Sequence, residues 1–302
     1  MATKNANKNA VIILAAGKGT RMKSDLPKVL HKVCGKSLVG HVINAALSLS
    51  PAKIAIVISK DSTVPSLTPK NKIIEYAVQK NQLGSGDAAK AAGAKVIAAV
   101  SVFDGSDVSV GISDHDFGFA QGVLAGPILL ERKPGQATYK VAILNADSLG
   151  PNLLDRKQGL IDGLKTTVTN FEVVTDVEAW AEDTALSAVE TILQAHADLD
   201  IILTVNDPGS LGAASAVEAA GKDLKTGTIV MGLGIDKRVL EGVLDGTFPG
   251  SVSPEPIATG RALAAVSFAL NRGEAVPANV VVPVVTITTE NAQSMIDALY
   301  AE

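Results

Sequence analysis

Short apolar stretches alternate with longer amphipathic ones along nearly the whole chain. The short stretches predict strands at Val11–Ala16, Lys53–Ser59, Lys72–Val78, Lys95–Val100, Tyr139–Asn145, Asp200–Val205, Gly227–Gly232 and Val280–Thr288. Apolar residues at helical spacing predict helices at Pro27–Leu49, Gly86–Ala94, Phe117–Leu130, Asn152–Leu164, Ala181–Ala195, Leu211–Ala220, Lys237–Leu244 and Glu255–Asn271. Strands and helices that alternate in this way form βαβ units, so the pattern predicts an α/β fold of doubly wound parallel sheets.

Two stretches interrupt this alternation. Asp61–Asn71 contains two prolines and several hydroxyl residues, so we expect at most a short helix there. Phe103–Val108 is rich in Gly, Ser and Asp and predicts a loop at a change from one lobe to the next.

The composition fits this fold class. A chain of 302 residues with 47% hydrophobic content can bury one large core or two modest ones. Aromatic residues make up only 3%, so Ala, Val, Ile and Leu must build the interior, as is common where helices cover both faces of a sheet. The single cysteine, Cys34, excludes an internal disulfide and a structural zinc site, and we expect it to be a small buried residue.

Charge and hydropathy limit the expected partners. A net charge of -4, from 27 basic and 31 acidic residues, gives no basic face for a nucleic-acid backbone. No apolar run approaches the roughly 18 residues that span a bilayer. Residues 1–10 and Val11–Ala16 loosely imitate a secretion signal, but the apolar run is short and leads into a glycine loop, so we interpret it as a strand. We therefore expect a monomer without nucleic-acid or membrane partners, found in the cytoplasm on recombinant expression.

A glycine loop follows the first predicted strand, in the run Leu14-Ala15-Ala16-Gly17-Lys18-Gly19-Thr20-Arg21-Met22. Small residues between a strand and a helix let backbone N–H groups turn toward an anion. Arg21 and Lys28 can add positive charge beside a bound phosphate. The same run is also compatible with a close-packed crossover that binds nothing.

This loop, followed by Pro27-Lys28, resembles the signature of nucleotidyltransferases, and in particular of bacterial N-acetylglucosamine-1-phosphate uridylyltransferases. The likeness continues through Gly35-Lys36-Ser37 and resumes at Gln79 and Gln82-Leu83-Gly84-Ser85-Gly86. The resemblance implies contacts to the triphosphate from Ala15, Gly17, Gly19, Thr20, Arg21 and Lys28, and contacts to the base from Gln79, Gly84 and Ser85.

The likeness ends between Gly86 and Ala94, before the family's metal-binding and acceptor sites. Asp104, Asp107 and Asp114 lie in the right region, but none stands in the Gly-Asp context of that family. Nucleotidyl transfer without a metal ion loses several kcal/mol of charge stabilisation. We therefore expect no catalytic residues and no cofactor, with Mg²⁺ required only if the segment is a working nucleotidyltransferase.

From about residue 91 onward the chain carries a second set of motifs. They include Val110-Gly111-Ile112-Ser113-Asp114, Gly118–Gly126, Lys140–Leu144, Asp155–Leu160, Asn206-Asp207, Leu211–Ala213, Ile229–Gly232 and Asn271–Pro277. This segment resembles the ribose-type periplasmic sugar-binding proteins. The resemblance implies two Rossmann-like lobes that are joined by crossing strands and close over a sugar.

The residues that would bind the sugar are only partly retained. The resemblance gives the solute cleft four positions, at Asp114, Leu154, Asn206 and Gly234. Leu154 stands where the family has a binding Arg and Gly234 where it has an Asp; Pro254 and Val100 replace two further polar groups. Each unmet polar group costs about 1–3 kcal/mol, so we expect altered or lost recognition of a ribose-like sugar. A turn and helix cap is the alternative role of Asn206.

Two families in one chain predict a chimera, whether recombined or engineered, with a natural protein of unusual front lobe as the alternative. The first lobe would comprise residues 1–108 and 255–277, and the second 109–254 and 278–302. The expected function is non-catalytic binding of a sugar-like solute, and the larger segment suggests a periplasmic origin. The alternatives are a nucleotide-binding protein or nucleotidyltransferase that uses the glycine loop, and a protein that folds but binds no ligand.

Overall fold

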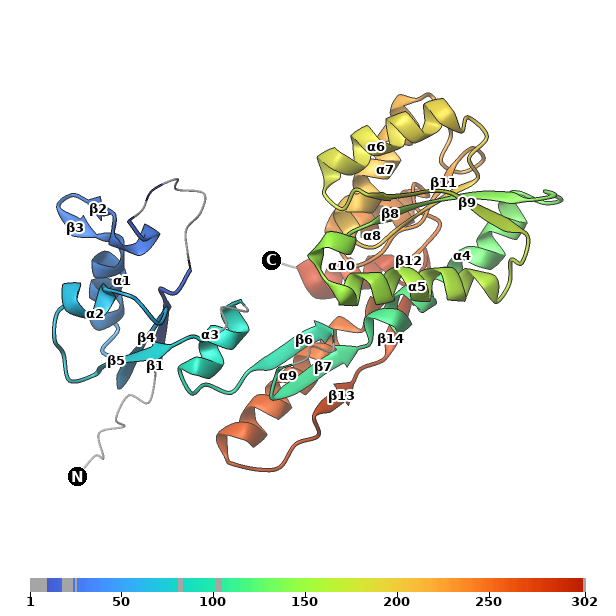
Figure 1. Cartoon of the computed structure of the whole chain (residues 1–302). Helices are drawn as coiled ribbons and strands as arrows, with labels where there is room; N and C mark the ends of the chain where they lie inside the picture. The colour runs from blue at the N-terminus through green and yellow to red at the C-terminus, as the bar shows by residue number, and fades with distance from the viewer. Residues whose placement is uncertain (1–9, 18–23, 25, 81–83, 102–104, 301–302) are drawn as a thin grey trace. The chain divides into compact units, whose positions relative to one another are not determined.

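The chain divides into two units of unequal size, and each has its own hydrophobic core (Figure 1). The computed structural model describes residues 10–17, 24, 26–80, 84–101 and 105–300. The first unit comprises residues 1–97 and 103–108, and the second comprises 98–102 and 109–302. Parallel sheets and helices build both units, which confirms the predicted α/β class.

A three-stranded parallel sheet forms the centre of the first unit, in the order β1 (Ala10–Leu14), β4 (Lys53–Ile58), β5 (Ile74–Val78). All residues of β4 except the first are buried. Ile54 and Ile56 share a hydrophobic cluster with α1 (Leu38–Ser48), whereas Val57 belongs to a cluster with α3 (Ser85–Ala91). Side chains that alternate between two covered faces explain why this strand is apolar throughout.

The predicted helix Pro27–Leu49 is wrong in its first half. The chain instead forms a short 3-10 turn, η2 (Lys28–Leu30), and a hairpin of β2 (Lys32–Val33) and β3 (Lys36–Ser37), and α1 begins only at Leu38. Cys34 and Gly35 connect the hairpin with φ of 48° and 77°, the left-handed values that two-residue hairpin turns require. Cys34 is consequently exposed, not buried as we expected.

The connection between β4 and β5 contains the four-residue helix α2 (Val64–Leu67). The short helix predicted for Asp61–Asn71 is therefore confirmed. After β5 the chain reaches α3 through Gly84, whose φ of 106° suits a glycine.

A four-stranded parallel sheet forms the centre of the second unit, in the order β11-β10-β8-β9. Its strands are β8 (Tyr139–Asn145), β9 (Phe171–Glu178), β10 (Ile201–Thr204) and β11 (Ile229–Val230). The helices around it are α4 (Asp114–Arg132), α5 (Pro151–Lys165), α6 (Glu182–Ala195), α7 (Asp207–Ala219) and α8 (Lys237–Asp245). A 3-10 turn, η3 (Asp147–Leu149), joins β8 to α5.

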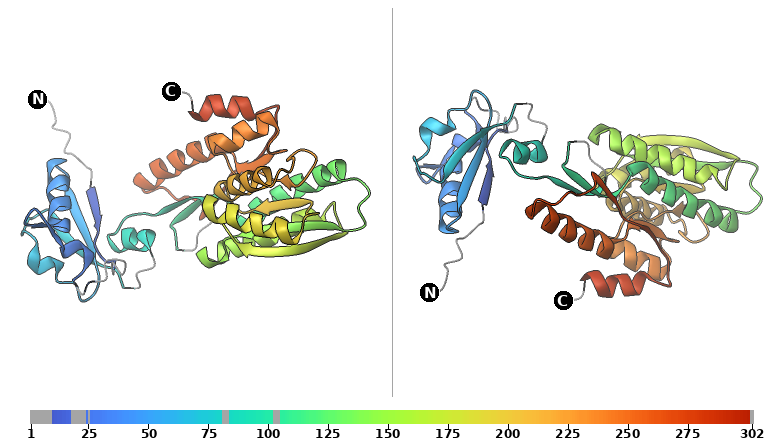
Figure 2. Two further views of the ribbon diagram at one scale, coloured as in Figure 1. Left: turned by 90° about the horizontal axis from the view of Figure 1, so that it is seen from above. Right: turned by 90° about the horizontal axis from the view of Figure 1, so that it is seen from below.

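Helices cover both faces of this sheet, as the views in Figure 2 show. Val141 and Ile143 of β8 share a cluster with α4 and α5. Ala142 and Leu144 belong to the cluster that contains α6, α7 and α8. The strand is buried on both faces, so its middle residues, Val141–Leu144, are all apolar.

Glycines bring α4 and α5 into close contact. A Cβ atom on Gly118 would lie 1.8 Å from the Arg156 carbonyl oxygen, and one on Gly159 would lie 1.9 Å from the His115 carbonyl oxygen. A Cβ atom on Gly122 or on Gly163 would lie 2.2 Å from a carbonyl oxygen of the opposite helix. Only glycine fits at these positions, and the resulting backbone contact fixes the start of α4 beside the middle of α5.

Two smaller sheets and two helices complete the second unit. One sheet has the order β13-β7-β6 and is built from β6 (Ile97–Ser101), β7 (Val108–Ile112) and β13 (Asn279–Val281), with β13 parallel to β7. The antiparallel pair is β12 (Ser251–Pro254) with β14 (Val284–Ile287). The helices are α9 (Pro256–Asn271) and α10 (Ala292–Tyr300). Residues 255–277, which we predicted to belong to the first lobe, are part of the second unit in this division.

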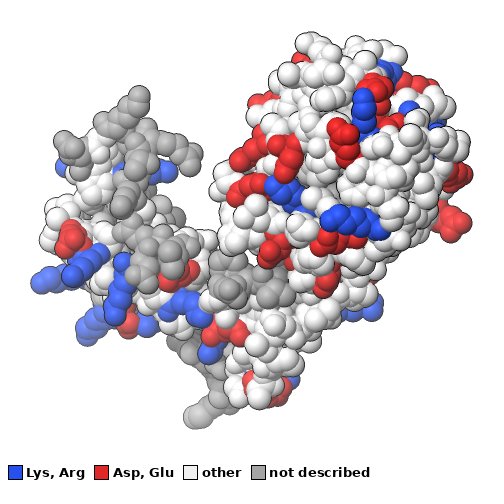
Figure 3. All heavy atoms as spheres, turned by 45° about the vertical axis from the view of Figure 1, so that its right-hand side comes forward, with Lys and Arg blue, Asp and Glu red and all other residues white. Residues whose placement is uncertain are grey.

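No helix in residues 10–17, 24, 26–80, 84–101 or 105–300 is long and apolar enough to cross a membrane. On the face drawn in Figure 3, blue basic and red acidic side chains of the larger unit are interspersed.

Candidate functional site

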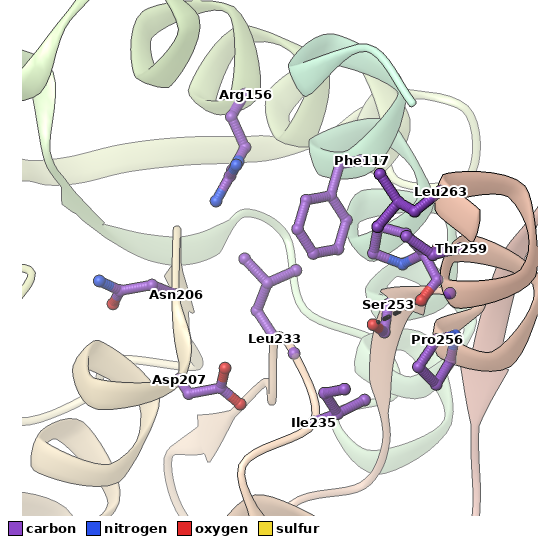
Figure 4. A pocket seen from close by; sticks show the side chains of 13 residues that line it. Phe117, Arg156, Asn206, Asp207, Leu233, Ile235, Ser253, Pro256, Thr259 and Leu263 are labelled. Atoms are coloured by element: carbon purple, nitrogen blue, oxygen red, sulfur yellow. Dashed lines mark hydrogen bonds between the residues drawn. The ribbon is translucent and has the colours of Figure 1, made fainter. Parts of the chain in front are cut away.

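A cavity of the second unit lies beyond the carboxyl ends of β10 and β11 (Figure 4). It has a volume of about 400 Å³. Its described lining residues are Phe117, Arg156, Asn206, Asp207, Leu233, Gly234, Ile235, Ser253, Pro254, Pro256, Thr259, Gly260 and Leu263. Open parallel sheets bind ligands at this edge, and the volume falls within the range of small-molecule sites.

Asn206 lies in this cavity but also caps a helix. Its Oδ1 atom accepts a hydrogen bond of 2.9 Å from the Gly209 N–H at the start of α7. Its Nδ2 group donates to the Trp180 carbonyl oxygen, also at 2.9 Å. The helix cap, which is the alternative role of this residue, is therefore present, and it holds the side chain at the cavity wall.

Arg156 is the cavity residue that the sequence analysis missed. Its Nε and Nη2 groups donate to Asp114 Oδ1, and its Nη1 group donates 2.8 Å to the Val205 carbonyl oxygen. The guanidinium carbon lies 4.7 Å from the centroid of the Phe117 ring. Cation–π contact and a buried ion pair together hold this arginine in one orientation.

The predicted position Leu154 lies elsewhere. Its side chain is 45% exposed, and it is not among the described residues that line the cavity. Arg156, two positions later on α5, brings the arginine to the cavity instead. Asp114 is buried at the start of α4 and reaches the cavity only through its ion pair with Arg156. The sequence carries this arginine in the motif Asp155–Leu160, next to the position that the family comparison selects.

Asp207 occupies the space next to Gly234. A Cβ atom on Gly234, whose φ is 103°, would lie 2.0 Å from Asp207 Oδ2. Asp207 Oδ1 accepts a hydrogen bond of 3.0 Å from the Asp236 N–H. Burial, with a smaller contribution from the Asp236 charge, raises the pKa of Asp207 to about 6. A carboxylate therefore lies beside Gly234, although the sequence predicted that this part of the cleft lacks a polar group.

The rest of the cavity wall is mainly apolar. Figure 4 shows Phe117, Leu233 and Leu263 around the space between Arg156 and α9. Two hydroxyl groups in the wall already donate to backbone oxygens, Ser253 to Pro254 and Thr259 to Glu255. The cavity thus combines apolar sides with a polar end that contains an arginine, an amide and a carboxylate.

The first unit contains a second cavity, of about 360 Å³, next to the glycine loop. Its described lining residues are Leu14, Ala16, Gly17, Gln79, Gly84, Ser85 and Ala88. Gln79 is buried, and its Nε2 group donates to the Gly84 carbonyl oxygen at 3.0 Å and to Asp87 Oδ2 at 2.8 Å. Four of the residues predicted to bind a nucleotide, Gly17, Gln79, Gly84 and Ser85, therefore lie around one space.

The remaining predicted nucleotide-binding residues are placed differently. Ala15 is buried, and its N–H donates to the Val57 carbonyl oxygen at 2.8 Å, so that group belongs to the sheet. Lys28 is exposed in η2 and is not among the described residues of the cavity wall. Gly19, Thr20 and Arg21 lie outside the described residues.

Two of the three carboxylates that we considered as metal ligands, Asp107 and Asp114, have other partners, and Asp104 lies outside the described residues. Asp107 accepts a hydrogen bond of 2.8 Å from the Val96 N–H and pairs with Lys95 at 3.3 Å. The Val96 N–H lowers the pKa of Asp107. No group of three His, Cys, Asp or Glu side chains that could hold a metal ion occurs in the part of the chain that the structure describes.

Comparison with protein families finds two matches in the chain. Residues 73–275, more than half of the sequence, match the family described as periplasmic binding protein domain. Residues 11–102 match the family described as MobA-like NTP transferase domain. Both resemblances predicted from the sequence are confirmed.

Individual relatives agree with these matches. The bifunctional protein GlmU of Lactobacillus gasseri is 55% identical over 84 residues, which are 27% of this chain and 18% of that protein. The chain thus spans less than a fifth of the length of this relative.

Solved structures of solute-binding proteins share the fold. A solute-binding protein of an ABC transporter from Bacillus halodurans, with bound myo-inositol, has a TM-score of 0.61 and 19% identity and covers 97% of this chain and 98% of its own. A solute-binding protein from Burkholderia graminis, in complex with D-arabinose, has a TM-score of 0.60 and 20% identity and covers 97% of this chain and 99% of its own. At these identities the likeness establishes the fold.

Proposed function

The chain belongs to the family described as periplasmic binding protein domain, and from this premise we propose that it binds a small sugar-like solute without catalysis. The cavity at the ends of β10 and β11 carries the proposal, because it offers Arg156, Asn206 and Asp207 at one end of an apolar space. Its volume of about 400 Å³ is of the order of small-molecule sites. The solved relatives that bind myo-inositol and D-arabinose support the same ligand class.

We propose that the specificity of this cavity differs from that of a ribose-type protein. Gly234 and Pro254 line the wall at positions where the resembled family has polar groups. Asn206 and Arg156 both make hydrogen bonds to the protein, so fewer of their groups remain for a sugar. A ligand with fewer hydroxyl contacts and a larger apolar face fits this lining better.

Thermal unfolding in the presence of myo-inositol, D-arabinose and related polyols tests the proposal. A ligand at about 100 times its Kd should stabilise the folded chain by about 2.7 kcal/mol. Gly260 offers a matched pair of variants, because a Cβ atom there meets no atom within 4 Å and the residue lines the cavity. Gly260→Leu should fill the space and abolish the shift, whereas Gly260→Ala should keep it. A shift that Gly260→Leu leaves unchanged would place the ligand elsewhere.

The cavity in the first unit favours a second candidate function, nucleotide binding. Its support is the meeting of Gly17, Gln79, Gly84 and Ser85 around about 360 Å³, together with the match of residues 11–102 to a nucleotidyltransferase family. UTP with Mg²⁺ should then raise the melting temperature, and Lys28→Ala should remove the effect, while Lys32→Ala on the exposed hairpin serves as the control. Flat melting curves with both sugars and UTP would favour a chain without a ligand.

The two matched ranges overlap at residues 73–102, because one begins at 73 and the other ends at 102. We place the junction of the two families within this overlap, close to α3, where the sequence analysis also placed it. The proposed functions depend only on the two cavities and hold however the junction arose.

A further inference from the structure

The carboxylate of Asp207 faces the larger cavity from the first residue of α7. Its Oδ1 atom accepts the Asp236 N–H, and its Oδ2 atom lies against Gly234, which leaves room for it by having no side chain. Asp207 is therefore held in place by the backbone of one loop and not by a charged side chain.

The charged groups around Asp207 are engaged with one another. Asp236 and Glu182 both pair with Arg238 at the start of α8, and the Tyr300 hydroxyl on α10 donates to the Ile235 carbonyl oxygen. Across the cavity, Arg156 pairs with Asp114. Of the Lys, Arg and His side chains that the structure describes, none lies within 4.0 Å of the Asp207 carboxylate.

The chemistry of this arrangement points to a cationic ligand group. The positive charge of Arg156 is offset by Asp114, so the ionised cavity carries the uncompensated negative charge of Asp207. A carboxylate beside apolar surface is costly when no opposite charge meets it, and Asp207 meets only backbone N–H donors. The raised pKa of Asp207 agrees with this cost.

We infer that the cavity binds a small polyhydroxy molecule that carries a protonated amine, with the ammonium group at Asp207 and the apolar face of the molecule against Phe117, Leu233 and Leu263. A charge-assisted hydrogen bond to a carboxylate is roughly twice as strong as a neutral one. The inference rests on the proposed solute-binding function and specifies the class of solute.

Calorimetric titration at pH 7 with D-glucosamine, D-galactosamine and D-mannosamine, each against its parent hexose, tests the inference. At least one amino sugar should bind about tenfold or more tightly than its parent, which corresponds to one charge-assisted contact. Asp207→Asn should remove the preference, so that each amino sugar and its parent hexose bind with about equal affinity. Asparagine keeps an oxygen for the Asp236 N–H, so the loop should be retained.

Titration of the unmodified chain gives a second readout that needs no variant. At pH 5 only about a tenth of a carboxyl group with a pKa of about 6 is ionised, so the affinity for the amino sugar should fall about tenfold while that for the parent stays constant. Equal binding of amino and neutral sugars, or a preference that survives in Asp207→Asn, would overturn the inference and leave solute binding intact. Failure of all six sugars, with flat melts against the neutral polyols, would overturn the proposed function itself.

Discussion

Arg156 and Asp207 present opposite charges to the same cavity, but their surroundings differ. The guanidinium of Arg156 meets Asp114 and the Phe117 ring, so its charge is compensated within the protein. The carboxylate of Asp207 meets backbone N–H groups and a glycine. A charge that is compensated within the protein can orient a ligand. An uncompensated charge favours ligands of opposite charge, and it lowers the stability of the folded chain when no ligand is bound.

The stability of the ligand-free chain should therefore depend on the ionisation of Asp207. Its folded-state pKa is about 6, above the ordinary 3.8, so the folded chain binds more protons than the unfolded chain between these values. The favourable contribution is fully present below about pH 4 and is lost as the pH rises through 6, by about 3 kcal/mol in all. Asp207→Asn should have the same unfolding free energy as the original chain at pH 4 and a higher one at pH 7, as measured by urea unfolding.

Asp183→Asn removes an exposed acid from the first turn of α6 as a control. A constant difference between the two chains across this range would contradict the assignment.

At the site, local motifs were easier to predict than distant contacts. Gln79, Gly84 and Ser85 come from one short run, and a single strand-to-helix connection brings them together. Arg156 reaches the cavity because glycines let α5 contact α4. Aligning this sequence with the family's binding Arg selects Leu154 instead. A contact that depends on the spacing of two helices cannot be read from the spacing of residues along one of them.

Among the elements, the pair α4 and α5 fixes the polar end of the cavity. Asp114 begins α4 and Arg156 lies on α5, so the ion pair between them depends on the backbone contact at Gly118 and Gly159. Any side chain at these glycines must push the helices apart, because the obstacle is a carbonyl group of the other helix.

Gly159→Ala should accordingly lower the unfolding free energy by about 1–3 kcal/mol, despite the better helix propensity of alanine. The comparison variant is Gly260→Ala in α9, where the new methyl group meets nothing within 4 Å and should stabilise by about 0.5–1 kcal/mol. Chemical denaturation of both variants measures the difference. If Gly159→Ala were as stable as Gly260→Ala, the close packing of α4 on α5 would be in doubt.

The elements themselves were predictable where burial is two-sided and less so elsewhere. The strand Tyr139–Asn145 was predicted with its observed ends, because all but one of its residues are buried. The strand β9 was missed, since most of its residues are partly or fully exposed and the apolar signal is weak. The hairpin at Cys34-Gly35 was predicted as helix because its apolar spacing imitates one, while the backbone angles at the turn decide the structure.

At the scale of the whole molecule, the two candidate ligand cavities fall in segments that match different families, and each lies within a single unit. The family match that covers residues 73–275 extends across the end of the first unit and most of the second. Ligand binding at one cavity therefore need not change the other cavity. The exception is a chain that closes over one shared ligand, as the two lobes predicted from the sequence would do.

Hydrogen exchange measured by mass spectrometry distinguishes these cases. If each cavity acts alone, a bound sugar should slow exchange in α5, α7 and the segment 231–236, while UTP with Mg²⁺ should slow it only around β5 and α3. The reason is that a ligand suppresses local opening mainly where it contacts the backbone or bridges elements.

Gly260→Leu should cancel the protection by the sugar and keep the protection by UTP, which excludes a general effect of additives. Protection by the sugar that extends to residues 10–80 would instead support the predicted lobe of residues 1–108 with 255–277, because only a shared binding event couples amides of the two units.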